Sequence, residues 1–323
     1  MIPNVKHHRL NSNMLPQSKI QKQPRGLKSK ISSYASLVRF SHTIFAMPFA
    51  MASLALAWPK HPVTLRVLLW IVVAMVGARS AAMAFNRLVD KKFDALNPRT
   101  QGWELPQGTV KAWEAIVLTA VASVIFVYAA FQLSWICFLL SPVALAIVFF
   151  YSLTKRFTWA AHFFLGLALS IAPIGAWLAV AGSAVTLAEL VTPLLLGLAV
   201  LFWLAGFDVI YSLQDREFDQ KQGLYSIPVR FGVASALRLS SFFHVVTVIF
   251  LALVGFSAQM GFIHWAGFAA VAAVLYWEHQ IVTPNDLSRI NRAFFDYNAY
   301  VSIAYFLATL TDIILRREFG WQL

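Results

Sequence analysis

The chain has few charged residues and a single cysteine. Only 12% of its 323 residues are Asp, Glu, Lys or Arg, whereas soluble domains contain roughly 25%. Because 59% are hydrophobic, the composition excludes both a soluble enzyme and a disordered chain. Cys137 has no second cysteine to pair with, which excludes an intramolecular disulfide and a thiolate metal site. This composition indicates an integral membrane protein that crosses the bilayer several times.

Long apolar runs fill most of the chain. A helix needs about 20 apolar residues to cross the hydrocarbon core of a bilayer. Windows of that length predict nine spans, at 40–58, 65–85, 111–131, 134–150, 159–181, 188–207, 234–255, 261–280 and 297–315. The third and fourth spans are separated by little more than Leu133 and Ser134.

Positive charge is unevenly distributed between the predicted loops. With the N-terminus inside, 21 of the 26 Lys and Arg residues fall on one side of the membrane. The other side holds four: Lys60, Arg66, Arg316 and Arg317. Cytoplasmic loops carry the excess of positive charge, so this asymmetry predicts a cytoplasmic N-terminus. The two arginines after the last span depart from the rule. The excess of Lys and Arg is explained by membrane topology and does not indicate a nucleic-acid-binding surface. We therefore expect no nucleic-acid partner.

The N-terminal segment is basic and lacks acidic residues. Its first 30 residues contain seven Lys or Arg and no Asp or Glu. We expect residues 1–36 to form a disordered cytoplasmic tail that anionic lipid attracts, with an organellar transit peptide as the alternative. Residues 37–323 are then expected to form a single transmembrane domain.

Two acidic segments follow apolar spans and lie on the same predicted side. In the first, Asn86, Asp90 and Asp94 are four residues apart and share one face of a helix. In the second, Asp208, Asp215 and Asp219 fall within about 40° of one another if the helix is continuous. Oxygen ligands without Cys or His suit Mg²⁺, which substrate phosphates usually complete. The two segments therefore predict a magnesium–diphosphate site between two facing halves of the bundle.

These segments resemble the two aspartate-rich motifs of the UbiA family of intramembrane aromatic prenyltransferases. The resemblance extends from about Leu37 to Leu315, and is closer to the bacterial 4-hydroxybenzoate polyprenyltransferase group. Phe207 to Gly232 also resembles a branch that includes menaquinone-pathway enzymes. The resemblance implies an all-α membrane protein with nine transmembrane helices in a ring around a central cavity. It implies Mg²⁺-dependent transfer of a polyprenyl group from polyprenyl diphosphate to an aromatic acid.

The family pattern also implies roles for individual residues. The residues that it implies as metal ligands are Asn86, Asp90, Asp94, Asp208, Asp215 and Asp219. It implies that Lys155 and Arg156, the last two residues of a Tyr-x-x-x-Lys-Arg loop, bind the diphosphate. The same role is implied for Lys91 and Arg99. Trp103 stands where many relatives carry an arginine, so we expect no diphosphate contact there.

Arg79 is a charged residue within a predicted span. It lies seven residues before Asn86 on the same helical face, and an unpaired arginine in a membrane is expensive to bury. We therefore expect Arg79 to bind the aromatic substrate or to orient the neighbouring carboxylates. The resemblance implies the same role for Arg39, Tyr151 and Asn298, although Arg39 also suits a topology anchor. Core hydrogen bonding is expected for the isolated histidines His162 and His244.

Several alternatives remain open at this point. The expected acceptor is 4-hydroxybenzoate, with a dihydroxynaphthoate of menaquinone biosynthesis as the main alternative and a heme-farnesylating relative as a minor one. A transporter is disfavoured because the carboxylates cluster at the membrane edge rather than at the midplane. The expected location is the bacterial inner membrane, with the active site facing the cytoplasm. We expect the lipid bilayer but no obligate protein among the partners.

Overall fold

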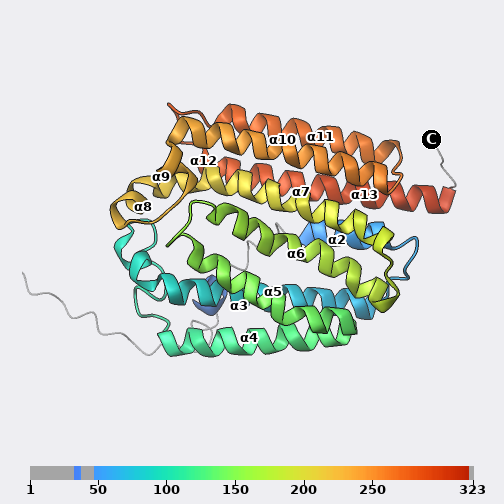
Figure 1. The fold of residues 1–323 in the computed structure, drawn as a ribbon, viewed down its shortest axis with the longest axis horizontal. Coiled ribbons are helices and arrows are strands. Elements are labelled where there is room, and N and C mark those ends of the chain that lie inside the picture. The colour runs from blue at the N-terminus through green and yellow to red at the C-terminus, as the bar shows by residue number, and fades with distance from the viewer. Residues whose placement is uncertain (1–32, 38–46, 320–323) are drawn as a thin grey trace, which may run out of the picture.

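The computed structural model describes residues 33–37 and 47–319, and the regular elements of these ranges are helices (Figure 1). The longer helices are α2 (Met47–Ala57), α3 (Leu65–Leu96), α4 (Ala112–Leu133), α5 (Trp135–Thr154), α6 (Ala161–Ala181), α7 (Leu187–Ser212), α10 (Val233–Ser257), α11 (Phe262–Ile281) and α13 (Asn298–Phe319). Short helical segments join them: η2 (Gly182–Ala184), η3 (Leu213–Asp215), α8 (Arg216–Gln222), α9 (Ile227–Phe231), α12 (Ile290–Arg292) and the π-helix η4 (Ala293–Tyr297).

The prediction of an all-helical membrane protein is confirmed. A long helix lies in each of the nine predicted windows, and in the described residues seven of these helical segments are long and apolar enough to cross a membrane. The other two are α2, whose described part has 11 residues, and α11, which includes the polar residues His264, Glu278 and His279. The predicted break at Ser134 is also confirmed, because its side chain caps α5 directly after α4 ends. Residues 1–32 of the predicted tail and Arg39 lie outside the described residues.

The long helices run side by side in one bundle (Figure 1). The group formed by α10, α11 and α13 lies on one side, α3, α4 and α5 lie on the other, and α6, α7 and α2 lie between them. The central position of α7 explains its burial, which is the highest among the seven candidate spans. Its Leu196, Trp203 and Leu204 pack in the main core with Phe49 of α2 and Tyr305 of α13.

Glycine allows two of these helices to approach closely. A Cβ atom on Gly166 of α6 would lie 2.4 Å from the backbone oxygen of Leu201 in α7. Small residues at such crossings permit backbones to pack together within a bilayer. The α6–α7 pair is therefore fixed by a direct backbone contact.

Both acidic segments lie at the end of the bundle that carries α8, α9 and α12 (Figure 1). The first is the last part of the uninterrupted helix α3, so its three side chains share one face as predicted. The second is not one continuous α-helix, and that expectation is wrong. Asp208 belongs to α7, Asp215 ends the tighter 3₁₀ turn η3, and Asp219 belongs to α8. A 3₁₀ turn has about 3.0 residues per turn, so it changes the direction of the following aspartates.

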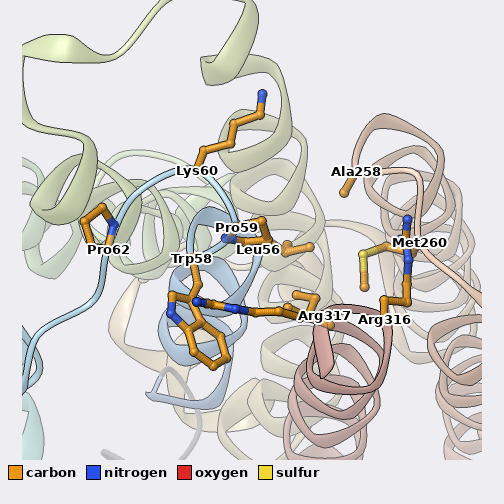
Figure 2. A pocket seen from close by; sticks show the side chains of 10 residues that line it. Leu56, Trp58, Pro59, Lys60, Pro62, Ala258, Met260, Arg316 and Arg317 are labelled. Carbon is orange, nitrogen blue, oxygen red and sulfur yellow. The ribbon is translucent and has the colours of Figure 1, made fainter. Parts of the chain in front are cut away.

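Two cavities lie in different parts of the bundle. One, of about 330 Å³, lies between α3, α4, α5 and α6 and is lined mostly by apolar side chains, with Arg79, Tyr151 and Ser141 among the exceptions. The other, of about 590 Å³, lies at the opposite end from the acidic segments, beside the α2–α3 connection and the end of α13 (Figure 2).

Candidate active site

The first acidic segment occupies the last turns of α3. The Asn86 amide donates to Asp90 Oδ2 at 3.0 Å, one helical turn away. Arg156, which follows α5, donates to Asp90 Oδ1 at 3.1 Å and to the Val89 carbonyl oxygen at 2.6 Å. Asp90 is thus held both by its own helix and by the loop after α5.

Asp94 is buried and forms an ion pair with Arg87 of the same helix. Its Oδ2 lies 3.6 Å from Arg87 Nη1 and accepts no hydrogen bond from the described residues. The Arg87 guanidinium stacks on Trp103, 3.6 Å from the ring centroid, and Arg99 lies 5.5 Å from the same ring. Aromatic faces attract such cations. Trp103 therefore lies against two cations of the site.

The loop after α3 reaches the second acidic segment. Asn97 donates to Asp215 Oδ1 at 3.0 Å. Arg99 donates to both Asp215 oxygens, through Nε at 2.9 Å and Nη2 at 2.6 Å. Such two-point contacts between guanidinium and carboxylate are strong and fix the orientation of both groups. They bring the two segments, more than a hundred residues apart in sequence, to one site.

Lys155 and Asp219 form a further contact between segments. Lys155 Nζ lies 3.4 Å from Asp219 Oδ2, and the Lys155 carbonyl oxygen accepts a hydrogen bond of 2.7 Å from the Tyr225 backbone N–H. Burial disfavours the charge on Lys155, but the carboxylates of Asp219, Asp215 and Asp208 outweigh it and raise the pKa of Lys155. Lys155 is therefore cationic at neutral pH.

Asp208 is held by a buried histidine. His162 Nδ1 lies 2.7 Å from Asp208 Oδ2, and His162 Nε2 accepts a hydrogen bond of 3.3 Å from the Ile227 backbone N–H. Since that N–H can only donate, the hydrogen-bond pattern assigns the ring proton to Nδ1, which donates to Asp208. The prediction that His162 forms a core hydrogen bond is confirmed, and its partner is a predicted metal ligand.

Other predicted site residues lie apart from the aspartates. Arg79 and Tyr151 line the apolar cavity between α3 and α6, and Arg79 Nε has no hydrogen-bond partner among the described residues. Lys91 is exposed, because it projects from a different helical face than its neighbour Asp90. Asn298 is buried elsewhere, where its amide donates to Glu278 Oε1 at 3.1 Å and to the Ala293 carbonyl oxygen at 3.0 Å.

Sequence analysis missed three residues that contact the acidic segments. They are Asn97, Arg87 and, as a partner of Asp208, His162. The proximity of Arg87 and Asn97 to the first segment in the sequence is a signal that pointed to them. No local signal connects His162 with Asp208, because their contact depends on the packing of α6 against α7.

The donor set fits Mg²⁺ in its chemistry. Carboxylate and amide oxygens are the ligands this ion prefers, and it usually binds through one or two carboxylates completed by water and substrate phosphates. Asp94 Oδ2 is a buried oxygen with no hydrogen bond from the described residues. Within those residues, no three His, Cys, Asp or Glu side chains are grouped closely enough to hold a metal alone.

The apolar helices, the acidic segments in contact with each other and an apolar cavity elsewhere in the bundle fit a membrane enzyme whose substrate joins a charged group to an apolar chain. Residues 46–303 match the UbiA prenyltransferase family. The chain belongs to this family and is a prenyltransferase of the UbiA type.

Relatives and solved structures support this assignment. The chain is 27% identical over 305 residues to a 4-hydroxybenzoate octaprenyltransferase of Marinobacter nauticus, covering 90% of this chain and 97% of the relative. It is 31% identical to a protein of the same name from Pseudomonas aeruginosa, covering 78% and 83%. An apo UbiA homologue from Aeropyrum pernix K1 superposes with a TM-score of 0.77 at 34% identity, covering 84% and 98%.

A fourth comparison concerns ligands. A UbiA homologue from Archaeoglobus fulgidus, solved with DMAPP and Mg²⁺, has a TM-score of 0.64 at 22% identity, covering 86% of this chain and 99% of the homologue. This likeness establishes the shared fold. The described ligands are those of the homologue.

Proposed function

We propose that the protein transfers a polyprenyl group from polyprenyl diphosphate to an aromatic acid, with 4-hydroxybenzoate as the acceptor. The observation that carries this proposal is the contact of Asn97 and Arg99 with Asp215, which joins the two acidic segments at one end of the bundle. A separate apolar cavity lies between α3, α4, α5 and α6. A charged diphosphate suits the acidic and basic end of this site, and a prenyl chain suits the cavity. Relatives named for 4-hydroxybenzoate support the choice of acceptor.

In this proposal Mg²⁺ is held by the six oxygen-bearing residues of the two segments: Asn86, Asp90, Asp94, Asp208, Asp215 and Asp219. When bound, the ion neutralises the diphosphate and makes it a better leaving group. Lys155, Arg156 and Arg99 already lie among the carboxylates. When a diphosphate enters, these cations are placed to donate to its oxygens.

The reaction follows from this placement of charge. The bond between the allylic carbon and the diphosphate oxygen breaks, and the diphosphate keeps the electron pair. An electron-rich ring carbon of the acceptor attacks the allylic cation, and the ring then loses its proton. The apolar cavity excludes water that would otherwise capture the cation. Arg79, which lines this cavity, is placed to bind the carboxylate of the acceptor.

A direct assay tests both the reaction and its acceptor. Purified protein is offered 4-hydroxybenzoate or a dihydroxynaphthoate with prenyl diphosphates of several lengths, and products are identified by mass. We expect prenylated 4-hydroxybenzoate that forms only with Mg²⁺ present. A prenylated naphthoate alone would establish the alternative acceptor, and no product from either acid would contradict the proposed reaction.

We propose a bacterial inner membrane location with the acidic segments facing the cytoplasm. The support is the concentration of Lys and Arg on the side of these segments. Nine membrane crossings, with α2 and α11 added to the seven helices described above, place the N-terminus on the same side.

A further inference from the structure

The cavity at the end of the bundle opposite the acidic segments is lined by several cations, although few cations are expected on that side of the membrane. Lys60, Arg316 and Arg317, three of the four cations assigned to that side, line it. Its volume is about 590 Å³. Since loops on the far side of a membrane usually carry few Lys and Arg, this clustering requires a local explanation.

Two of these cations have acidic neighbours. Lys60 Nζ lies 3.7 Å from Glu189, and its side chain is 65% exposed. Arg316 Nη1 lies 4.0 Å from Asp312 Oδ2 and donates to the Gln259 carbonyl oxygen. Asp312 itself is engaged elsewhere: its two oxygens accept the backbone N–H groups of Gly261 and His264 at 2.8 and 3.2 Å, where α11 begins. Arg316 therefore keeps much of its capacity to bind an anion.

Arg317 differs from both. Its guanidinium lies 4.7 Å from the centroid of the Trp58 ring, and Figure 2 shows it extended across that ring. Across residues 33–37 and 47–319, no carboxylate lies within ion-pair distance of it. Stacking uses the face of the guanidinium and leaves its N–H edge available, and that fork of donors matches the oxygens of a phosphate.

The remaining wall of the cavity is apolar. Leu56 and Met260 are exposed by only 7% and 9%, and Ile313 by 6%, so these side chains form a firm surface beside the arginines. A free phosphate ion would use the cations and leave this surface unused. A lipid with a phosphate headgroup uses both parts.

We propose that this cavity binds the phosphodiester headgroup of an anionic membrane lipid. Arg317 and Arg316 bind the phosphate, and the wall formed by Leu56, Met260 and Ile313 takes the glycerol and the first methylenes of an acyl chain. Because the cavity lies at the opposite end of the bundle from the acidic segments, this binding is independent of the proposed prenyl transfer.

Native mass spectrometry of the purified full chain tests the proposal. The protein in detergent is titrated with phosphatidylglycerol and, separately, with phosphatidylcholine that has the same acyl chains. We expect preferential retention of phosphatidylglycerol. Arg317→Gln should weaken its binding about fivefold, the effect of one surface cation near anionic lipid. Arg317→Lys, which keeps the charge but loses the planar fork, should weaken binding less than Arg317→Gln does.

Arg66→Gln is the matched control. Arg66 is a cation of the same side that donates to Gln132 at 2.9 Å and does not line the cavity. We expect this variant to bind phosphatidylglycerol as the wild type does. Equal binding by wild type and Arg317→Gln, or an equal loss in Arg66→Gln, would overturn the proposal. Displacement of the lipid by equimolar inorganic phosphate would instead identify a site for free anions, and would overturn it as well.

Discussion

At the scale of single residues, each aspartate of the two segments lies beside a nitrogen-bearing side chain. The pairs are Asp90 with Arg156, Asp94 with Arg87, Asp208 with His162, Asp215 with Arg99, and Asp219 with Lys155. Gathering several carboxylates at a membrane edge is unfavourable unless opposite charge offsets their repulsion. Arg156, Arg87, Arg99 and Lys155 supply this opposite charge, and His162 adds a hydrogen bond to Asp208, so the carboxylates can lie together before any metal is bound.

Neutralising single aspartates tests the proposed metal site. We expect Asp90→Asn and Asp215→Asn each to lower turnover by at least about a hundredfold, because loss of a metal ligand removes several kcal/mol of charge stabilisation. EDTA should abolish turnover and added Mg²⁺ should restore it. Glu217→Gln is the control, since Glu217 is exposed and lies between Asp215 and Asp219 in the sequence. Unchanged turnover in a folded Asp90 or Asp215 variant would remove that residue from the site.

Substitution of Arg79 separates the two substrates. Arg79→Lys keeps the charge but loses the planar fork that matches a carboxylate. We expect the KM of the aromatic acid to rise about tenfold, equivalent to one hydrogen bond of about 1.4 kcal/mol, with a smaller change for the prenyl diphosphate. Both constants are measured at saturating Mg²⁺. A rise confined to the diphosphate would place Arg79 at the leaving group instead.

The hydrogen bond from His162 should orient Asp208 for metal binding. His162→Leu removes the donor, whereas His162→Asn keeps an amide N–H near the position of Nδ1. Loss of such supporting contacts typically weakens metal affinity by about 10–100-fold. We therefore expect the Leu variant to need at least about tenfold more Mg²⁺ than the wild type for half-maximal turnover. The Asn variant should show a much smaller increase in this concentration. Thermal unfolding of each variant serves as the folding control, and equal Mg²⁺ requirements in all three proteins would contradict the assignment.

At the scale of helices, the crossing of α6 and α7 supports the contact between His162 and Asp208. The added methyl of Gly166→Ala would lie 2.4 Å from the Leu201 backbone oxygen, so the two helices must separate. Overpacking of this kind costs about 1–3 kcal/mol. We expect a Tm several degrees lower and reduced turnover. Gly175→Ala on the same helix is the control, because its added Cβ meets nothing within 4 Å, and an equal loss of Tm there would refute this explanation.

The helices themselves were predictable from local sequence, whereas the details of the second acidic segment were not. Apolar length predicts a span wherever lipid is the solvent, and Ser134 marks the break between α4 and α5 through its capping side chain. The 3₁₀ turn at Leu213–Asp215 has no such signal. Asp215 accepts hydrogen bonds from Asn97 and Arg99, which are distant in sequence, so its position depends on tertiary contacts.

The same distinction applies to the candidate site. The residue types and four-residue spacing of the first segment predict oxygen ligands on one helical face, and the structure confirms that shared face. The partners of the other four aspartates were not predictable, because those pairs join different helices and loops, whereas Arg87 and Asp94 both lie in α3. Substrate binding by Asn298 stays a prediction from the resemblance, and the structure adds that its amide donates to Glu278 and to the backbone of η4.

At the scale of the whole molecule, the placement of both acidic segments at one end of the bundle determines topology. Reporters fused after Thr109 and after Gly232 should both report the cytoplasm, and one fused after Gly182 should report the opposite side. Thr109 follows α3 and Gly232 follows α9, whereas Gly182 follows α6. Opposite results for Thr109 and Gly232 would exclude a shared site, because both acidic segments must face the same compartment.

Four of the five aspartates in the two segments are paired with Lys or Arg, and this has a thermodynamic consequence for ligand binding. A metal ion alone must displace cations from carboxylates, and a diphosphate alone must approach those carboxylates. When both enter together, the released cations gain phosphate oxygens while the carboxylates gain the metal. Binding of each ligand then strengthens binding of the other by the same factor, as linkage requires. In the proposed reaction, the two ligands thus form a positively cooperative pair, and departure of the diphosphate lowers the affinity for the ion.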